Sequence, residues 1–294
     1  MNNCLSKELC DEVLNDVNTQ MAAMDANTKC GERTRENGFG GVLARVCRYD
    51  MYQRNTGVFQ KALRFMLGNH SQNNNKDNKD SKDSKDSKDN TDNNNTTEER
   101  KTREEKEEGE AIEDIPNTEQ LRKLFASLFE TIDDVPFTEL SVLISDPGAP
   151  RQQLHPDNQY QSICPLYTVF IALQDITLPM GPTVFLPKTN TEICHKDFKQ
   201  STNDYLKDGS KENDIFLTSR EWRSSCLKKG DVQILDSRCL HAATANVSDQ
   251  RRALLYFTLR NPKCLEFGLE GTPIITEGSL FKDVNICLAD YSKK

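Results

Sequence analysis

This sequence lacks both long apolar runs and an excess of positive charge. No stretch approaches the ~20 apolar residues of a membrane-spanning helix, and the start, MNNCLSKELCDEVL, lacks the apolar segment of a secretory signal. Acidic residues number 46 against 38 basic ones, a formal net charge of −8. Because phosphate backbones and anionic lipids repel such a chain, we expect neither nucleic acid nor a membrane as partner. The expected location is cytoplasmic.

Closely paired cysteines are also missing, although the chain has ten cysteines. None forms a CxxC pair, so the spacing indicates neither a structural zinc site nor a redox motif. We expect reduced thiols that mostly pack in the interior. Cys239 lies two residues before His241 and could approach a metal bound there, although a core cysteine is the simpler interpretation.

One segment is almost without apolar residues. Residues 71–110 combine Asn, Lys, Asp and Glu around a repeated KDS unit. Such a composition cannot bury enough apolar surface to offset the entropy lost on ordering. We therefore predict a low-complexity disordered insertion within a single domain spanning 1–294, and a solvated surface linker rather than a docking arm.

The rest of the chain divides into a helical front and a strand-rich back. Helical spacing of apolar residues predicts helices at 7–22, at 57–67 and after the capping pair Asn117 and Gln120. In the first helix the shared face consists of Leu9, Val13, Val17 and Met21. From Phe137 onward, short β-rich runs such as ELSVLIS and RALLYFTLR alternate with turn residues. The pattern predicts a mainly β fold with flanking helices (α+β), a sandwich or jelly roll.

Histidine is scarce, with four in the chain, and one of them forms an unusual pair. His155 and Asp157 are separated by Pro156 in the stretch QQLHPDNQYQ. In an extended segment, side chains two apart share a face, so both could bind one ion. Proline lacks an N–H group, which favours a strand edge or end. An HxD pair alone is weak support for a metal site.

A second histidine strengthens the hypothesis. His241 ends a β-rich run and Arg252 begins the next; a turn centred on Asn246 and Val247 would make them cross-strand neighbours. Two imidazoles and one carboxylate suit a non-haem iron site with open positions, and also catalytic zinc. A guanidinium nearby suits the far carboxylate of 2-oxoglutarate, which favours iron. A surface ion pair is the simpler role for Arg252, and Arg251 competes for the inward position.

At these residues the chain resembles the phytanoyl-CoA dioxygenase-like family of iron(II)- and 2-oxoglutarate-dependent oxygenases. The resemblance covers roughly 135–262 and rests on LHPD, MGPTVFLPKTN and KGDVQILDSRCLHAATANVSDQRR, in that order. It implies a double-stranded β-helix core, a jelly-roll or cupin-like fold, at 135–262. It also implies Fe(II), with 2-oxoglutarate and O2 as cosubstrates. By this resemblance His155, Asp157 and His241 are the iron ligands and catalytic residues, and Arg252 anchors 2-oxoglutarate.

The resemblance implies a dioxygenase that hydroxylates an unactivated C–H bond of a small organic substrate, with release of succinate and CO2. The chain departs from the family pattern where Lys188, Thr189 and Asn190 replace a Gly-Ser-His type turn, so secondary cosubstrate contacts stay open. Further candidates on the predicted strands are Thr168 and Phe170 for the cosubstrate, and Arg151, Gln153 and Tyr160 for the substrate.

Two other interpretations stay open. A non-oxygenase metal-binding β-helix protein, such as a cupin-like isomerase or a degenerate binding module, would keep the three metal residues without needing Arg252. A scaffold acting through the 71–110 segment is the other. We expect His195 to be an exposed loop residue and His70 to stabilise a helix end. The pattern indicates neither the substrate's identity nor the oligomeric state.

Overall fold

The computed structural model describes residues 1–27, 47–52, 57–68, 118–130, 132, 135–158, 160–201, 220–264 and 288. All of these belong to one compact unit, formed by Met1–Gly68 and Pro116–Lys294. The second unit, Asn69–Ile115, lies outside the described residues, and so do the predicted disordered insertion at 71–110 and His70. The predicted extent of the domain, 1–294, therefore stays a prediction.

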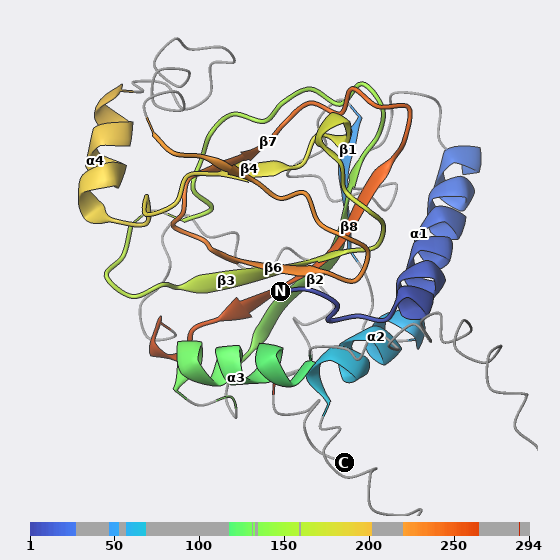
Figure 1. Cartoon of the computed structure of the whole chain (residues 1–294), viewed down its shortest axis with the longest axis horizontal. Helices are drawn as coiled ribbons and strands as arrows, with labels where there is room; N and C mark the ends of the chain where they lie inside the picture. Colours follow the sequence, from blue (N-terminus) through green and yellow to red (C-terminus); the bar gives the residue numbers. More distant parts are fainter. Residues whose placement is uncertain are drawn as a thin grey trace, which may run out of the picture. The chain divides into compact units, whose positions relative to one another are not determined.

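A five-stranded antiparallel sheet forms one layer of the fold (Figure 1). Its strands, in spatial order, are β1 (Arg48–Tyr52), β2 (Phe137–Ser145), β8 (Arg252–Arg260), β3 (Leu166–Ala172) and β6 (Val232–Asp236). The register between β2 and β8 shifts once, between Phe137 and Glu139. Neighbouring strands come from distant parts of the sequence, so this sheet joins the front of the chain to its back.

A smaller antiparallel sheet of three strands lies opposite, as Figure 1 shows for β4 and β7 above β3 and β6. Its order is β5 (Arg223–Ser224), β4 (Thr183–Phe185) and β7 (His241–Ala243). Two facing antiparallel sheets with helices outside confirm the predicted jelly-roll core, a mainly β fold with flanking helices.

Three helices pack on the outer face of the larger sheet: α1 (Lys7–Asn27), α2 (Gly57–Leu67) and α3 (Thr118–Phe129). The α1 start is capped, because Ser6 Oγ accepts a hydrogen bond of 3.3 Å from the Leu9 amide. The predicted apolar face of α1 is buried in the main core. The sequence located α2 correctly, and α1 extends five residues beyond the predicted end. No helix within the described ranges is long and apolar enough to cross a membrane.

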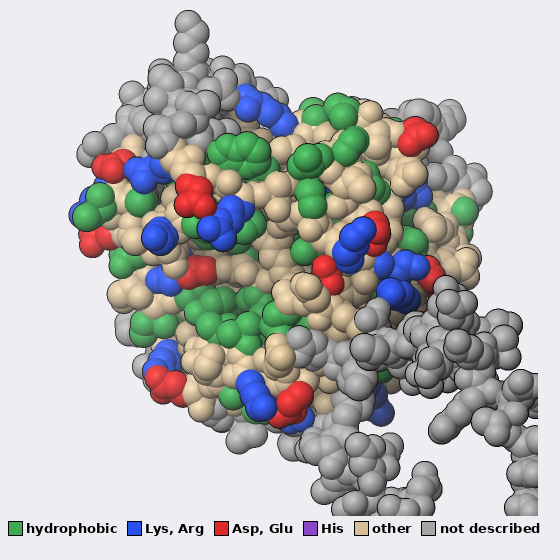
Figure 2. All heavy atoms as spheres, viewed as in Figure 1, with side chains coloured by type: hydrophobic (Ala, Val, Ile, Leu, Met, Phe, Trp, Pro, Cys, Tyr) green, Lys and Arg blue, Asp and Glu red, His purple; other side chains and the backbone are tan. Residues whose placement is uncertain are grey.

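The remaining helical segments lie in the connections. They are α4 (Glu192–Ser201) and the short 3-10 helices Leu178–Met180 and Pro262–Cys264. On the face drawn in Figure 2, acidic and basic side chains are interspersed rather than separated by sign. Exposed ion pairs such as Lys61 with Glu12, at 2.7 Å, add little stability in water.

The two faces of the larger sheet differ in chemistry. Alternate residues such as Val169, Leu255 and Phe257 join the core beneath the helices. Because successive side chains of a strand point to opposite faces, Thr168 and Tyr256 point into the space between the sheets. The inner face therefore carries the polar residues that surround the candidate site.

One predicted pairing is wrong. His241 pairs with Phe185 of β4 in the small sheet, whereas Arg252 pairs with Ser145 of β2 in the large one. Asn246 does stabilise a reversal, because its side-chain amide donates to the Ser145 and Gln250 carbonyls at 2.9 and 2.8 Å. The connection crosses between the sheets there, so β7 and β8 do not form a hairpin. A count of residues around a turn cannot reveal that crossing.

Candidate metal centre

His155 and His241 are joined through their backbones. The His155 amide donates to the His241 carbonyl at 3.0 Å, and the His241 amide donates back at 2.9 Å, in an isolated antiparallel bridge. Directly opposed residues of an antiparallel pair place their side chains on the same face. The two imidazole centroids accordingly lie 4.6 Å apart.

Backbone carbonyls orient both rings. His155 Nδ1 lies 2.7 Å from the Gln153 carbonyl, and His241 Nδ1 lies 2.9 Å from the Cys239 carbonyl. A carbonyl only accepts hydrogen bonds, so each Nδ1 carries the hydrogen and donates it. Each Nε2 then presents a lone pair. This arrangement prepares neutral imidazoles for metal binding.

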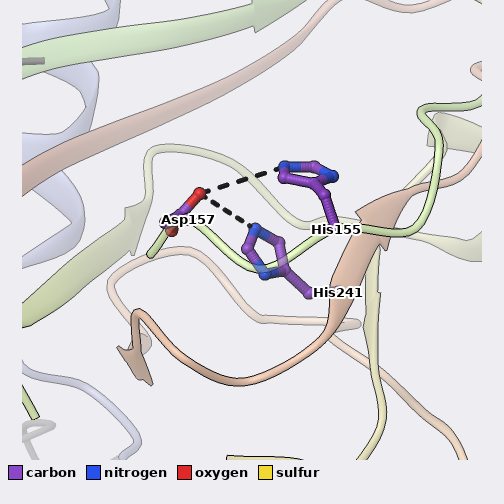
Figure 3. Close-up of side chains that lie close together, drawn as sticks. All are labelled: His155, Asp157 and His241. Carbon is purple, nitrogen blue, oxygen red and sulfur yellow. Dashed lines mark ion pairs between the residues drawn. The ribbon is translucent and has the colours of Figure 1, made fainter. Parts of the chain in front are cut away.

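Asp157 completes a cluster of three donors, drawn in Figure 3. Its Oδ1 lies 3.5 Å from His241 Nε2 and 3.9 Å from His155 Nε2. One ligand atom from each residue lies within 4.8 Å of the others. Ligand atoms about 2.1 Å from a shared ion lie roughly 3–3.5 Å apart, so the spacing is close to that of a metal site.

The surrounding hydrogen bonds attach the HxD segment to the chain on both sides of His241. The Gln152 amide donates to the Ala243 carbonyl at 2.7 Å, and the Asn158 amide donates to the Ser237 carbonyl at 3.0 Å. Pro156 lies between these contacts, where no N–H group is needed. Exposure increases from buried His241 through half-buried His155 to exposed Asp157. Two imidazoles and one carboxylate on one side of an ion suit iron(II).

Arg252 is a buried cation with unused donors. Its side chain is 0% exposed, and Nη1 donates to the Gly181 carbonyl. Within the described ranges, Nε and Nη2 have no hydrogen-bond partner. Burial, with a smaller effect from the Arg48 charge, lowers the pKa of Arg252 to about 9. A buried guanidinium with free donors is costly unless an anion binds it, and a carboxylate matches its geometry.

Arg252 also reaches the small sheet that carries His241. Gly181, its carbonyl partner, precedes β4, and β4 pairs with β7. Gly181 adopts a positive φ of 72°, and a Cβ there would lie 2.6 Å from the Thr244 carbonyl oxygen. Only glycine fits this close approach. The glycine that begins the MGPTVFLPKTN motif thus positions a carbonyl for Arg252.

The other predicted site residues are arranged less closely. Thr168 and Phe170 lie on the inner face of β3, and the Phe170 ring packs 5.6 Å from Tyr256. Arg151 is exposed, Gln153 is half-buried, and the Tyr160 ring lies 5.8 Å from His195. The roles of all five in binding cosubstrate or substrate stay predictions.

His195 was predicted to be an exposed loop residue, and this is wrong. It lies within α4 and is 4% exposed, with Nε2 at 2.7 Å from the Arg238 carbonyl. Cys239 does not join the donor cluster: its Sγ contacts the Leu186 carbonyl at 3.2 Å, and burial raises its pKa. Its contacts with Leu186 and Thr189 support the simpler interpretation of this cysteine as a packing residue.

A buried polar cluster on the inner face was missed by the sequence analysis. The Tyr256 hydroxyl lies 2.7 Å from Glu139 Oε1 and 3.2 Å from Asp50 Oδ1. Burial raises the pKa of Asp50 to about 6 and that of Glu139 to about 7. The only available signal was a charged residue at an inward position of an otherwise apolar strand run.

Many solved structures resemble this chain weakly, and HygX, AviO1 and SnoK are three of them. HygX from Streptomyces hygroscopicus, with nickel and 2-oxoglutarate bound, is 10% identical at a TM-score of 0.47, covering 89% of this chain and 82% of that one. AviO1 from Streptomyces viridochromogenes Tue57 is 17% identical at a TM-score of 0.37, and the match covers 51% of this chain and 63% of that one. The non-heme alpha ketoglutarate dependent carbocyclase SnoK from nogalamycin biosynthesis is 19% identical at a TM-score of 0.34. The match covers 43% of this chain and 50% of that one.

The chain therefore spans half the length of that carbocyclase. Among curated proteins, no sequence matches this chain.

A family model gives a broader match. The model described as phytanoyl-CoA dioxygenase (PhyH) matches residues 2–254, which include the His-Asp-His cluster and Arg252. The resemblance seen in the sequence motifs is confirmed, together with iron as the cofactor and 2-oxoglutarate and O2 as the cosubstrates of this oxygenase family. The chain belongs to the phytanoyl-CoA dioxygenase (PhyH) family.

Proposed function

We propose that this chain is an iron(II)- and 2-oxoglutarate-dependent dioxygenase that hydroxylates an unactivated C–H bond of a small organic substrate, releasing succinate and CO2. Family membership supports the oxygenase type. The finer proposal assigns His155, Asp157 and His241 as iron ligands and Arg252 as the anchor of the cosubstrate. The donor cluster and the buried guanidinium support these assignments.

The observation that carries the proposal is the unused hydrogen-bonding capacity of Arg252. A metal-binding protein without a dicarboxylate cosubstrate has no need for a fully buried arginine with two unpartnered nitrogens. Replacing such a group with an apolar one would remove a penalty, so its presence indicates a bound anion. The far carboxylate of 2-oxoglutarate matches this requirement in charge and in planar geometry.

The protein residues have separate tasks in this proposal. The Gln153 and Cys239 carbonyls hold the imidazoles with Nε2 free, and Asp157 supplies the negative donor. Arg252 binds and orients the dicarboxylate in a site from which most water is excluded. Iron at such a site supplies the activation of O2, which no side chain provides.

Product analysis tests the reaction type. Compounds that accelerate 2-oxoglutarate-dependent succinate release are incubated with the protein under heavy-isotope O2, and the products are weighed by mass spectrometry. Hydroxylation predicts one labelled oxygen atom gained for each succinate. A product of unchanged mass, or one that has only lost hydrogen, would contradict hydroxylation while leaving the dependence on 2-oxoglutarate intact.

A further inference from the structure

Two carboxyl groups share one phenol on the inner face of the larger sheet. Asp50 comes from β1, Glu139 from β2 and Tyr256 from β8. The phenol oxygen lies within hydrogen-bonding distance of both carboxyls, at 2.7 Å from Glu139 and 3.2 Å from Asp50. A phenol has one hydrogen to donate, so one carboxyl must lack a donor or hold a proton.

The cluster has too little positive charge. Within the described part of the chain, neither Asp50 nor Glu139 forms an ion pair at 4.0 Å or less. Burial is the main cause of the raised pKa of each carboxyl, and the Asp157 charge raises both further. The Arg48 charge lowers the pKa of Asp50 without forming a direct ion pair. A substrate cation would supply what these groups lack.

Ser141 provides a second, geometric sign of a missing ligand. It lies opposite Tyr256 in the register of β2 and β8, two residues along the strand from Glu139 and on the same face. Its side chain is 0% exposed, and among the described residues its hydroxyl has no well-directed hydrogen bond. The Ser141 hydroxyl lies close enough to the Tyr256 phenol to lower its pKa slightly, but not in the geometry of a hydrogen bond. Buried hydroxyls are normally bonded, so the bonding capacity of Ser141 is left for a ligand.

Two side chains of this face are partly exposed. Glu139 and Phe170 are only half-buried, although both point between the sheets. The Phe170 ring packs against Tyr256 at 5.6 Å and adds an apolar wall beside the carboxyls. The cluster lies on the face of the larger sheet that is turned toward the small sheet, and His241 belongs to the small sheet. A bound molecule could thus contact the cluster while another of its atoms faces the metal.

We propose that Glu139, Asp50, Tyr256 and Ser141 form the recognition subsite for a protonated amine of the substrate, so that the substrate class is a small organic amine. The carboxyls neutralise the ammonium group, while the phenol and serine oxygens accept its remaining hydrogens. An alcohol could form hydrogen bonds here but would leave the negative charge unbalanced. The reaction performed on this substrate rests on the proposed function; the binding preference does not.

Matched probes test the preference by calorimetry on the full chain. Benzylamine is compared with benzyl alcohol, cyclohexylamine with cyclohexanol, and putrescine with butane-1,4-diol. At least one amine should bind about tenfold tighter than its alcohol, and Glu139→Gln should remove that advantage while leaving alcohol binding unchanged. Glu119→Gln is the control, because it makes an equal charge change at an exposed side chain of α3. This variant should keep the preference for the amine.

Proton release supplies a readout that a merely structural role would not affect. Near pH 6.5 the carboxyl pair holds a proton, so amine binding should release it, and the apparent enthalpy should differ between buffers of different ionisation enthalpy. Asp50→Asn serves as a second variant if Glu139→Gln fails to fold by circular dichroism.

The proposal is overturned if no amine binds better than its alcohol, or if the preference survives in the folded cluster variants. A visible Fe(II)–2-oxoglutarate absorption band, recorded in the same variants, tests the proposed function separately.

Discussion

His155 and His241 exchange two backbone hydrogen bonds, at 3.0 and 2.9 Å, and hold their imidazoles 4.6 Å apart. The attachment between the two segments therefore does not depend on the side chains. A substitution of either histidine removes a candidate ligand while the backbone bridge persists. Metal binding and folding can thus be separated by experiment.

His241→Ala should fold normally and lose iron. Residues that hydrogen-bond to metal ligands typically contribute about 10–100-fold to metal affinity. Loss of a ligand itself should therefore weaken Fe(II) binding by more than about 100-fold. Competition with a chromophoric chelator under anaerobic conditions measures this. His195→Gln is the matched control, because His195 is buried outside the donor cluster. Equal iron affinity in the wild type and His241→Ala would refute the assignment of this ligand.

Arg252→Met should stabilise the ligand-free protein and strongly weaken 2-oxoglutarate binding. The native guanidinium is buried with two unpartnered nitrogens, so an apolar replacement should add roughly 1–3 kcal/mol to the free energy of unfolding. Thermal unfolding and calorimetric titration with 2-oxoglutarate measure the two effects. Arg251→Met removes the ion pair with Asp146 instead and should leave cosubstrate affinity unchanged. Loss of 2-oxoglutarate affinity in Arg251→Met, with unchanged affinity in Arg252→Met, would assign the anchor to Arg251.

The three residues that the structure brings together in the donor cluster were predictable because their signals are local or depend on short spacing. Alternation in an extended chain placed His155 and Asp157 together, and the motif order added His241. The role of Arg252 as the cosubstrate anchor stays a prediction. The sheet to which each strand belongs was not predictable. Asn246 stabilises a reversal in a hairpin or in a crossing between sheets, and only long-range pairing distinguishes the two.

The acidic cluster was beyond sequence reasoning for a related cause. Asp50 and Glu139 lie on either side of the 71–110 segment, and Tyr256 belongs to a third strand. Nothing in their local sequence shows that β1, β2 and β8 become neighbours. The burial of His195 was missed because its loop-like sequence forms α4, where the Arg238 carbonyl provides a buried partner.

Gly181→Ala should be much more damaging than Gly148→Ala. Both glycines have positive φ, which costs an alanine about 1–2 kcal/mol. A Cβ at Gly148 meets nothing within 4 Å, whereas one at Gly181 meets the Thr244 and Ala245 backbone. We expect roughly 3 kcal/mol or more of destabilisation at Gly181, with weakened 2-oxoglutarate binding. Denaturant unfolding compares the variants, and equal losses would contradict the close approach.

The Glu139→Gln variant should become progressively more stable than the wild type as pH rises. Burial raises the pKa of Glu139 from 4.5 to about 7, so the folded state favours the protonated acid. The stabilisation that the protonated Glu139 gives the folded state is complete below about pH 4.5 and is lost as pH rises through 7. At pH 8 the variant should exceed the wild type by roughly 1–3 kcal/mol, with little difference at pH 4. Denaturant unfolding across this range, with Glu119→Gln as control, should show that slope; parallel profiles would contradict it.

We propose that His155, Asp157 and His241 hold an iron ion to which 2-oxoglutarate binds, while Arg252 anchors the far carboxylate of 2-oxoglutarate. Anaerobic titration of the full chain with Fe(II) and 2-oxoglutarate, followed by visible absorption, tests this directly. We predict a charge-transfer band in the wild type that is lost in His241→Ala and that needs far more cosubstrate in Arg252→Met. No band in the wild type, or an unchanged band in both variants, would contradict the account.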